Sequence, residues 1–169
     1  IIGLAKADTY FKKINTELIG ISVDSLNSHL AWLYDIYLKT GLIVNFPIIA
    51  DQNGVIARKY GMISNDVSST ETVRNIFIID DKGIIRSIFV YPMNIGRYIP
   101  EILRTVTALQ YSDQNNCMTP ANWSPGNPMI VPPPKTFNAL RERNESINKN
   151  RNGMCWYLSF KNPETKKLE

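Results

Sequence analysis

Few residues of this chain combine the types and the spacing that chemistry requires. Cys117 and Cys155 are its two cysteines; they stand 38 positions apart, and neither belongs to a CxxC motif or a Cys/His group. A zinc site is therefore nearly excluded, because structural zinc needs closely spaced thiolate or imidazole ligands. A small-molecule binding domain also has little support, because the sequence contains no GxGxxG or other phosphate-binding loop.

Three other residues have reactive or charged side chains near the ends of expected elements. Arg74 directly precedes the apolar run NIFIID, and Asp24 and His29 lie in VDSLNSHLAW. Taken alone, Arg74 is typical of an arginine at a strand edge, Asp24 of a helix cap and His29 of a packed core histidine. These residues form no evident nucleophile–base pair, so their chemistry alone does not name an activity.

Periodic apolar residues predict the elements that position these side chains. IIGLAKADTYFKKIN has helical spacing, yet no Ser, Thr, Asp or Asn precedes it and no Glu occupies its first turn, so nothing in the sequence caps its amino end. The remaining expected elements are strands at 16–24 and 46–51, helices at 28–40, 55–60 and 99–110, and a hairpin at 75–91 turning at Asp81-Lys82-Gly83. Asp24, Ser25 and Asn27 are candidate caps for the start of the helix at 28–40, and Gly41 and Gly61 are expected to end their helices. This order predicts an α/β layer fold with helices on a mixed sheet.

The composition changes after Tyr111. SDQNNCMTPANWSPGNPMIVPPPKT is rich in Pro, Asn and Ser, and a short helix at 137–147 and the aromatic cluster CWYLSF follow it. This part has too few apolar residues to fold alone. We expect it to pack its aromatic side chains on the preceding residues or on another subunit.

The net charge of +4 lies entirely in the C-terminal segment. Residues 1–134 hold 11 basic and 11 acidic residues, whereas residues 135–169 hold 8 basic and 4 acidic residues. Without a nucleic-acid motif, this excess is typical of a solvated surface and predicts no nucleic-acid partner. No apolar run is long enough to span a membrane, and two isolated cysteines suit a reducing compartment, so the chain is expected to be cytoplasmic.

Five ordered motifs resemble the peroxiredoxin family, in the branch typified by one-cysteine peroxiredoxins with a C-terminal arm. They are ELIGISVDSLNSHLAW, FPIIAD, TVRNIFIIDDKG, YPMNIGR and TPANWSPGNPMIVPPP. The resemblance implies an α/β, thioredoxin-like fold with a mixed sheet, flanking helices and an extended C-terminal arm. Residues 1–111 would form the core without its N-terminal strands, and residues 112–169 a dimerisation arm.

The same resemblance implies a thiol peroxidase that reduces hydrogen peroxide and alkyl hydroperoxides through a cysteine sulfenic acid, without a cofactor or metal. A thiol, such as a thioredoxin-like protein or glutathione, would recycle it. The peroxidatic cysteine of the family lies in a Pro-x-x-x-Thr-x-x-Cys motif, in the first turn of a helix similar to IIGLAKADTYFKKIN. We therefore expect that cysteine a few residues ahead of Ile1, and we expect the chain as printed to be inactive.

The family pattern assigns roles to several residues. Arg74 matches the arginine that stabilises the thiolate and hydrogen-bonds the peroxide, and Arg97 matches a second arginine near the site. Cys155 is a candidate resolving cysteine, although Ser159 stands where a cysteine often follows Trp-Tyr-Leu, which favours a bystander thiol. His29 matches the pattern as well, and we interpret it as structural. Cys117 lies in a polar loop and is not the peroxidatic cysteine.

The arm implies a homodimer able to assemble into larger rings such as a decamer, with no membrane partner. The alternative function is a non-catalytic peroxiredoxin-like assembly or chaperone protein. The residues ahead of Ile1 distinguish the two, because a Pro-x-x-x-Thr-x-x-Cys motif there would support the enzyme.

Overall fold

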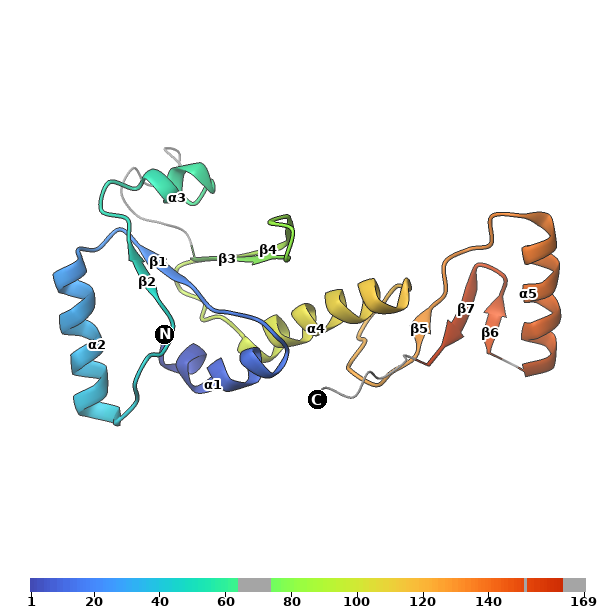
Figure 1. Cartoon of the computed structure of the whole chain (residues 1–169), viewed down its shortest axis with the longest axis horizontal. Helices are drawn as coiled ribbons and strands as arrows, with labels where there is room; N and C mark the ends of the chain where they lie inside the picture. The colour runs from blue at the N-terminus through green and yellow to red at the C-terminus, as the bar shows by residue number, and fades with distance from the viewer. Residues whose placement is uncertain (64–73, 151, 163–169) are drawn as a thin grey trace. The chain divides into compact units, whose positions relative to one another are not determined.

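The computed structural model describes residues 1–63, 74–150 and 152–162 (Figure 1). Thr72 and Val73 of the motif around Arg74 lie outside the described residues, as do residues 163–169 of the expected arm. The chain divides into two compact units, Ile1–Pro100 and Glu101–Glu169, which are described separately below.

The first unit contains the elements that position the candidate site. These are α1 (Ile2–Lys13), β1 (Gly20–Ser22), α2 (Leu26–Thr40), β2 (Ile48–Ala50), α3 (Val55–Lys59), β3 (Arg74–Ile79), β4 (Ile85–Tyr91) and the first residues of α4 (Ile99–Asn115). All seven complete elements lie where the sequence predicts them, to within a few residues at their ends.

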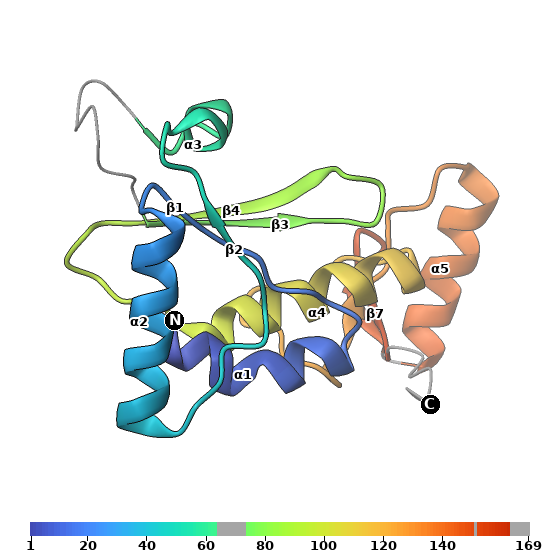
Figure 2. The same ribbon diagram turned by 60° about the vertical axis from the view of Figure 1, so that its left-hand side comes forward.

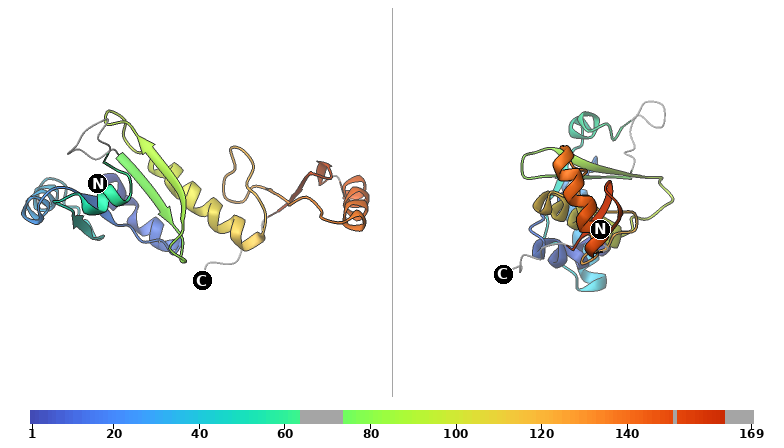
Figure 3. Two further views of the ribbon diagram at one scale, coloured as in Figure 1. Left: turned by 90° about the horizontal axis from the view of Figure 1, so that it is seen from above. Right: turned by 90° about the vertical axis from the view of Figure 1, so that its right-hand side faces the viewer.

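The strands of this unit pair in both directions, as a mixed arrangement requires. β1 and β2 are parallel, with Gly20 opposite Ile48, because α2 crosses over between them. β3 and β4 form an antiparallel hairpin with Arg74 opposite Tyr91 (Figure 2; the green arrows in the left panel of Figure 3). Within the described residues these are separate two-stranded ladders, so β1 and β3 each pair along one edge only.

Local signals in the sequence set the helix ends. Ser25 caps α2, because its side chain accepts a hydrogen bond from the Ser28 N–H at 3.1 Å. Gly41 ends α2 in the left-handed conformation, with φ of 68°, which a glycine adopts without steric cost. No side chain caps α1, as its sequence predicts.

The apolar residues of the first unit are unevenly buried. In α1, Ala7, Asp8 and Phe11 are buried, and Lys12 donates to Asp8 Oδ2 at 2.7 Å. In α2 the buried residues are His29 and Ile36. The opposite side of α2 is apolar and exposed; its members are Leu26, Leu30, Tyr34, Tyr37 and Leu38. This set, the outer stripe of α2, has the helical spacing of a packed face although it is exposed.

The second unit contains the rest of α4 together with β5 (Met129–Ile130), α5 (Phe137–Asn150), β6 (Gly153–Cys155) and β7 (Leu158–Lys161). Its strands form an antiparallel sheet in the order β5-β7-β6 (α5 and the strands are orange and red in the right panel of Figure 3). α4 extends to Asn115 instead of the expected Gln110, because the first residue in the left-handed conformation is Asn116, with φ of 47°. α5 likewise ends at Asn150 instead of 147.

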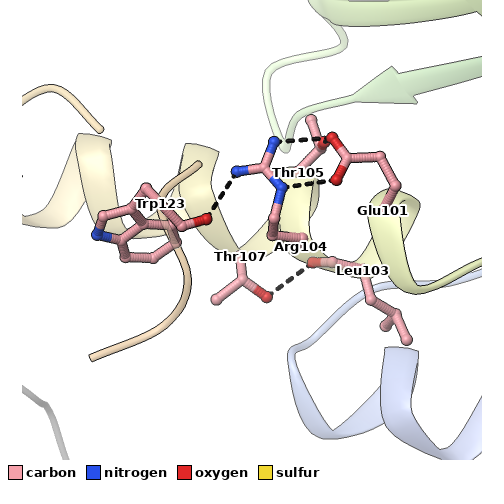
Figure 4. Close-up of polar contacts among 6 residues, drawn as sticks. All are labelled: Glu101, Leu103, Arg104, Thr105, Thr107 and Trp123. Carbon is pink, nitrogen blue, oxygen red and sulfur yellow. Dashed lines mark hydrogen bonds and ion pairs between the residues drawn. The ribbon is translucent and has the colours of Figure 1, made fainter. Parts of the chain in front are cut away.

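Trp123 anchors the Pro- and Asn-rich segment within the second unit (Figure 4). Arg104 donates two hydrogen bonds to the Glu101 carboxylate, at 2.6 and 2.7 Å, and a third to the Trp123 carbonyl at 3.0 Å. The Trp123 indole is 1% exposed and donates to the Asn127 carbonyl at 2.9 Å. The segment therefore buries its tryptophan beside α4, in the unit to which both belong.

No helix in the described parts of the chain has the length and apolar character needed to cross a membrane. Over the same residues, no group of three or more His, Cys, Asp and Glu side chains is placed to hold a metal ion.

Candidate functional site at the amino end of the first helix

The β3–β4 hairpin brings the two candidate arginines together. Arg74 is the first residue of β3 and lies opposite Tyr91, the last residue of β4. Arg97 follows six residues after Tyr91, ahead of α4, and its guanidinium interacts electrostatically with both Arg74 and Tyr91. Hairpin register therefore places two arginines that are distant in sequence at one end of the sheet.

The amino end of α1 lies within the electrostatic reach of both arginines. The pKa of the Ile1 amino group is lowered from its usual value of 8.0, first by burial and then by the positive charges of Arg97 and Arg74. The unpaired N–H groups of the first helical turn carry a partial positive charge of their own. Helix end and guanidinium groups thus act on the same small region.

This region is electropositive, and no described carboxylate neutralises its two arginines. The pKa of Arg97 is lowered, first because neighbouring atoms shield its guanidinium from water and then because Arg74 repels its charge. Among the residues that the structure describes, no carboxylate pairs with Arg74 or Arg97. Two like charges at a helix amino end favour an anion, since the anion relieves their repulsion. Arginine also offers fixed N–H donors and stays charged when partly desolvated.

His29 belongs to a different cluster, at the end of β1. Its Nε2 lies 2.7 Å from Ser22 Oγ, and Ser22 Oγ in turn donates to Asp24 Oδ2 at 2.7 Å. Because the single Ser22 hydroxyl proton is directed to Asp24, the Nε2–H of His29 donates to Ser22 Oγ. His29 is 3% exposed, and its Nδ1 has no hydrogen-bond partner in the part of the chain that the structure describes. This geometry joins β1 to α2 and agrees with the structural interpretation of His29; Ser22 has no distinguishing motif in the sequence and was missed.

The two cysteines lie in the second unit as free thiols. Cys117 is buried, 4% exposed, directly after α4 and Asn116. Cys155 ends β6 and is half-buried, and its hydrogen bond to Tyr157 raises the pKa of that tyrosine. Neither cysteine lies at the amino end of a helix, the position that lowers the pKa of a thiol.

Comparisons with known proteins match most of the chain. The AhpC/TSA family model matches residues 1–88, and the model of the C-terminal domain of 1-Cys peroxiredoxin matches residues 108–146. Peroxiredoxin 2 of Caldanaerobacter subterraneus subsp. tengcongensis is 49% identical over 162 residues, which cover 95% of this chain and 72% of that protein. The peroxiredoxin of Aquifex aeolicus is 43% identical over 170 residues, covering 95% and 75%.

Solved structures agree. A yeast mitochondrial 1-Cys peroxiredoxin superposes with a TM-score of 0.79 at 37% identity, covering 95% of this chain and 76% of that one. A mutant of peroxiredoxin 6 from Arenicola marina gives a TM-score of 0.79 at 28% identity, covering 97% and 78%. The fold is therefore thioredoxin-like. The chain belongs to the peroxiredoxin family, of the one-cysteine type, and the function of that family is thiol-dependent peroxide reduction.

Proposed function

We propose that Arg74 and Arg97 form the cationic wall of the peroxidatic site, at the amino end of α1. The observation that carries the proposal is their common action on Ile1 without a compensating carboxylate in the described chain. In this proposal the peroxidatic cysteine belongs to a Pro-x-x-x-Thr-x-x-Cys segment ahead of Ile1. Cys117 and Cys155 do not suit the peroxidatic role, because neither lies at the amino end of a helix.

The chemistry follows from the charges. A cysteine is nucleophilic as its thiolate, and its usual pKa of about 8.5 must fall for the thiolate to dominate near neutral pH. The helix end and the guanidinium groups favour the anion and so lower that pKa. The thiolate attacks one peroxide oxygen, the O–O bond breaks, and the sulfur becomes a sulfenic acid while the departing oxygen takes a proton to give water or an alcohol. The N–H donors of Arg74 stabilise the charge on the departing oxygen.

Substitution of Arg74 tests this assignment in a chain that carries the cysteine segment ahead of Ile1. Arg74→Gln is expected to lower kcat/KM for hydrogen peroxide about 10²- to 10³-fold, as loss of an oxyanion donor does, and to raise the thiolate pKa measured by pH-dependent alkylation. Arg74→Lys keeps the charge without the guanidinium fork and is expected to give an intermediate rate. The matched control is Arg58→Gln, which removes an exposed arginine of α3 in the same unit. Equal rates in Arg74→Gln and the control would contradict the proposal.

The 169-residue chain provides a second test, because it should consume no peroxide catalytically. Turnover that Cys155→Ser abolishes would move the nucleophile to Cys155 and overturn the placement. If the extended chain is itself inactive, the non-catalytic assembly or chaperone function gains support.

The partners are also proposed. A thiol reductant, glutathione or a thioredoxin-like protein, would reduce the sulfenic acid; the support is that the structure of the yeast relative concerns thiol resolution through glutathione and thioredoxin systems. Cys155 would serve as a resolving thiol only if a disulfide to the peroxidatic cysteine forms, which mass spectrometry of the oxidised protein measures. We propose a homodimer in which residues 112–169 contribute to the interface, supported by exposed Phe137 (76%) and Met154 (81%). Sedimentation velocity checks the dimer.

A further inference from the structure

A cavity in the second unit has no role in the peroxidase site. It has a volume of about 190 Å³ and lies among α5, β7 and the extended segment after β5. Val131, Ile147 and Phe160 supply apolar lining. The polar lining comes from Arg143, Ser146, Asn152, Ser159 and Lys161, so the charged lining residues are both cations.

Arg143 is held in place by one side of its guanidinium. Nη1 donates to the Pro132 carbonyl at 2.6 Å and to the Trp156 carbonyl at 3.3 Å. These bonds tie α5 to the polyproline segment and to the turn between β6 and β7. Within the described chain no acceptor bonds Nε or Nη2. That edge carries two parallel N–H donors, the geometry that binds two oxygens of one oxyanion.

Ser159 adds an unused hydroxyl. It lies in β7, is 4% exposed, and its Oγ has no hydrogen-bond partner among the described residues. β6 approaches it closely because residue 153 is glycine: a Cβ there would lie 2.7 Å from Ser159 Cα and 2.8 Å from the Leu158 carbonyl oxygen. A buried hydroxyl without a partner is unfavourable unless something supplies an acceptor.

Lys161 supplies the second charge. It ends β7 at a position opposite Met129, and its side chain forms no ion pair or hydrogen bond with another described residue. The neighbouring carboxylate of α5, Glu145, pairs instead with Arg141 at 3.8 Å. The two cations of the cavity therefore have no carboxylate among its lining residues.

We propose that this cavity binds a small tetrahedral oxyanion such as phosphate, held by the free edge of Arg143, the Lys161 ammonium and the Ser159 hydroxyl. Such an ion accepts several hydrogen bonds at once and neutralises both cations. Because water occupies roughly 30 Å³ per molecule in the liquid, the cavity has room for this ion and a few waters, and it is too small for a nucleotide. The proposal is independent of the peroxidase assignment.

The test is a titration of the full 169-residue chain with inorganic phosphate at constant ionic strength, followed by ¹H–¹⁵N NMR. The amide signals of residues 143 and 159–161 should shift in a saturable manner. Lys161→Gln should weaken binding about tenfold, as loss of one charged hydrogen bond does, and Ser159→Ala about threefold. Arg141→Gln removes an exposed arginine of the same helix and should leave binding unchanged.

Three results would overturn the proposal. One is the absence of saturable shifts. Another is equal weakening by Arg141→Gln and Lys161→Gln, which would indicate general attraction to a basic surface. The third is acetate binding as tight as phosphate binding, which would assign the cavity to carboxylates. Arg143→Gln is not the primary variant, because Arg143 also donates hydrogen bonds to the Pro132 and Trp156 carbonyls. The side chain of Lys161 makes no hydrogen bond or ion pair within the described chain, so its substitution removes none.

Discussion

Arg74 and Arg97 are single residues whose like charges lie close together, which is electrostatically unfavourable in the absence of an anion. Their guanidinium groups repel each other, which is why the charge of Arg74 contributes to the lowered pKa of Arg97. A thiolate between them and the end of α1 would convert that repulsion into attraction. Stability of the anion-free chain and acidity of the thiol should therefore respond in opposite directions to loss of one arginine.

Arg97→Gln tests this opposition. In the 169-residue chain it should raise the free energy of unfolding by a few tenths of a kcal/mol. Arg97 is exposed as a residue and its guanidinium is only partly shielded, so solvent screens most of the repulsion. The gain should shrink at high salt. Urea unfolding at low and high salt measures it. A loss of stability at low salt would show that Arg97 makes a structural contact that outweighs its repulsion from Arg74.

The buried hydrogen bond between His29 and Ser22 should contribute to stability. His29→Ala should lower the free energy of unfolding by about 2 kcal/mol, because it removes a buried ring and the donor to Ser22 Oγ. Ser22→Ala should cost about 1 kcal/mol. In a double-mutant cycle the two losses should be less than additive. Strict additivity would contradict the hydrogen bond.

The sequence allows some of these residue roles to be predicted. Gly41 was predicted to end α2, and the structure confirms it. Of the three candidate caps for its start, Asp24, Ser25 and Asn27, the structure selects Ser25. Both signals are readable because caps depend on neighbouring residues only. Arg74 and Arg97 are 23 positions apart, and the hairpin register places Arg74 opposite Tyr91, six residues ahead of Arg97. The family pattern pointed to both arginines, whereas their own spacing did not. Ser22 was missed because its partner is a histidine seven residues later on another element.

The turn of the β3–β4 hairpin is held by hydrogen bonds to one carboxylate. The Asp80 carboxylate accepts from the Ile84 and Lys82 N–H groups, at 2.9 and 3.0 Å, and from Arg86 at 3.3 Å. Chiefly through the Ile84 N–H, and then the others, these bonds hold the pKa of Asp80 below its usual value of 3.8. Gly83, with φ of 76°, completes the turn.

A pH dependence follows from the lowered pKa. A carboxyl whose pKa is lower in the folded chain stabilises the fold fully above its unfolded pKa, and this contribution is lost as the pH falls through the folded value. Unfolding free energy should therefore decrease below about pH 4, and less steeply in Asp80→Asn than in the parent. Urea unfolding between pH 2 and pH 7 checks the difference. Asp35→Asn, at an exposed pair with Lys39, is the control and should follow the parent curve. Parallel curves for Asp80→Asn and the parent would refute the assignment.

Element positions were more predictable from the sequence than their pairing. Apolar spacing located the helices and strands, because that spacing reflects which face each element buries. The end of α4 was placed too early, since the left-handed Asn116 that ends it has no obligatory sequence signal. The β3–β4 hairpin was predicted and the structure confirms it, because its strands are joined by a short turn. The parallel β1–β2 pairing, and the separation of the two ladders within the described residues, were not predicted, because they depend on residues that are distant in the chain.

At the scale of the whole molecule, the two units differ in how well their apolar residues are covered. The second unit has a three-stranded sheet and buries Trp123 and Met129, at 1% and 0% exposure. The first unit holds two-stranded ladders, which are marginally stable by themselves, and exposes the outer stripe of α2. Its burial therefore contributes less to stability per residue.

We accordingly expect the 169-residue chain to unfold in a broad, low-temperature transition that begins in the first unit. Tryptophan fluorescence can separate the units, because Trp32 lies in the first, and Trp123 and Trp156 in the second. A chain that retains only Trp32 should report a gradual transition, and a chain that retains only Trp123 a later and steeper one, since Trp123 is enclosed by bonds from Arg104 and to Asn127. Calorimetry of the parent should show a van't Hoff enthalpy below the calorimetric enthalpy. A sharp transition shared by both reporters would instead mean that the outer stripe of α2 is buried in solution. A midpoint that depends on protein concentration in the same experiment would show that a second copy of the chain buries it.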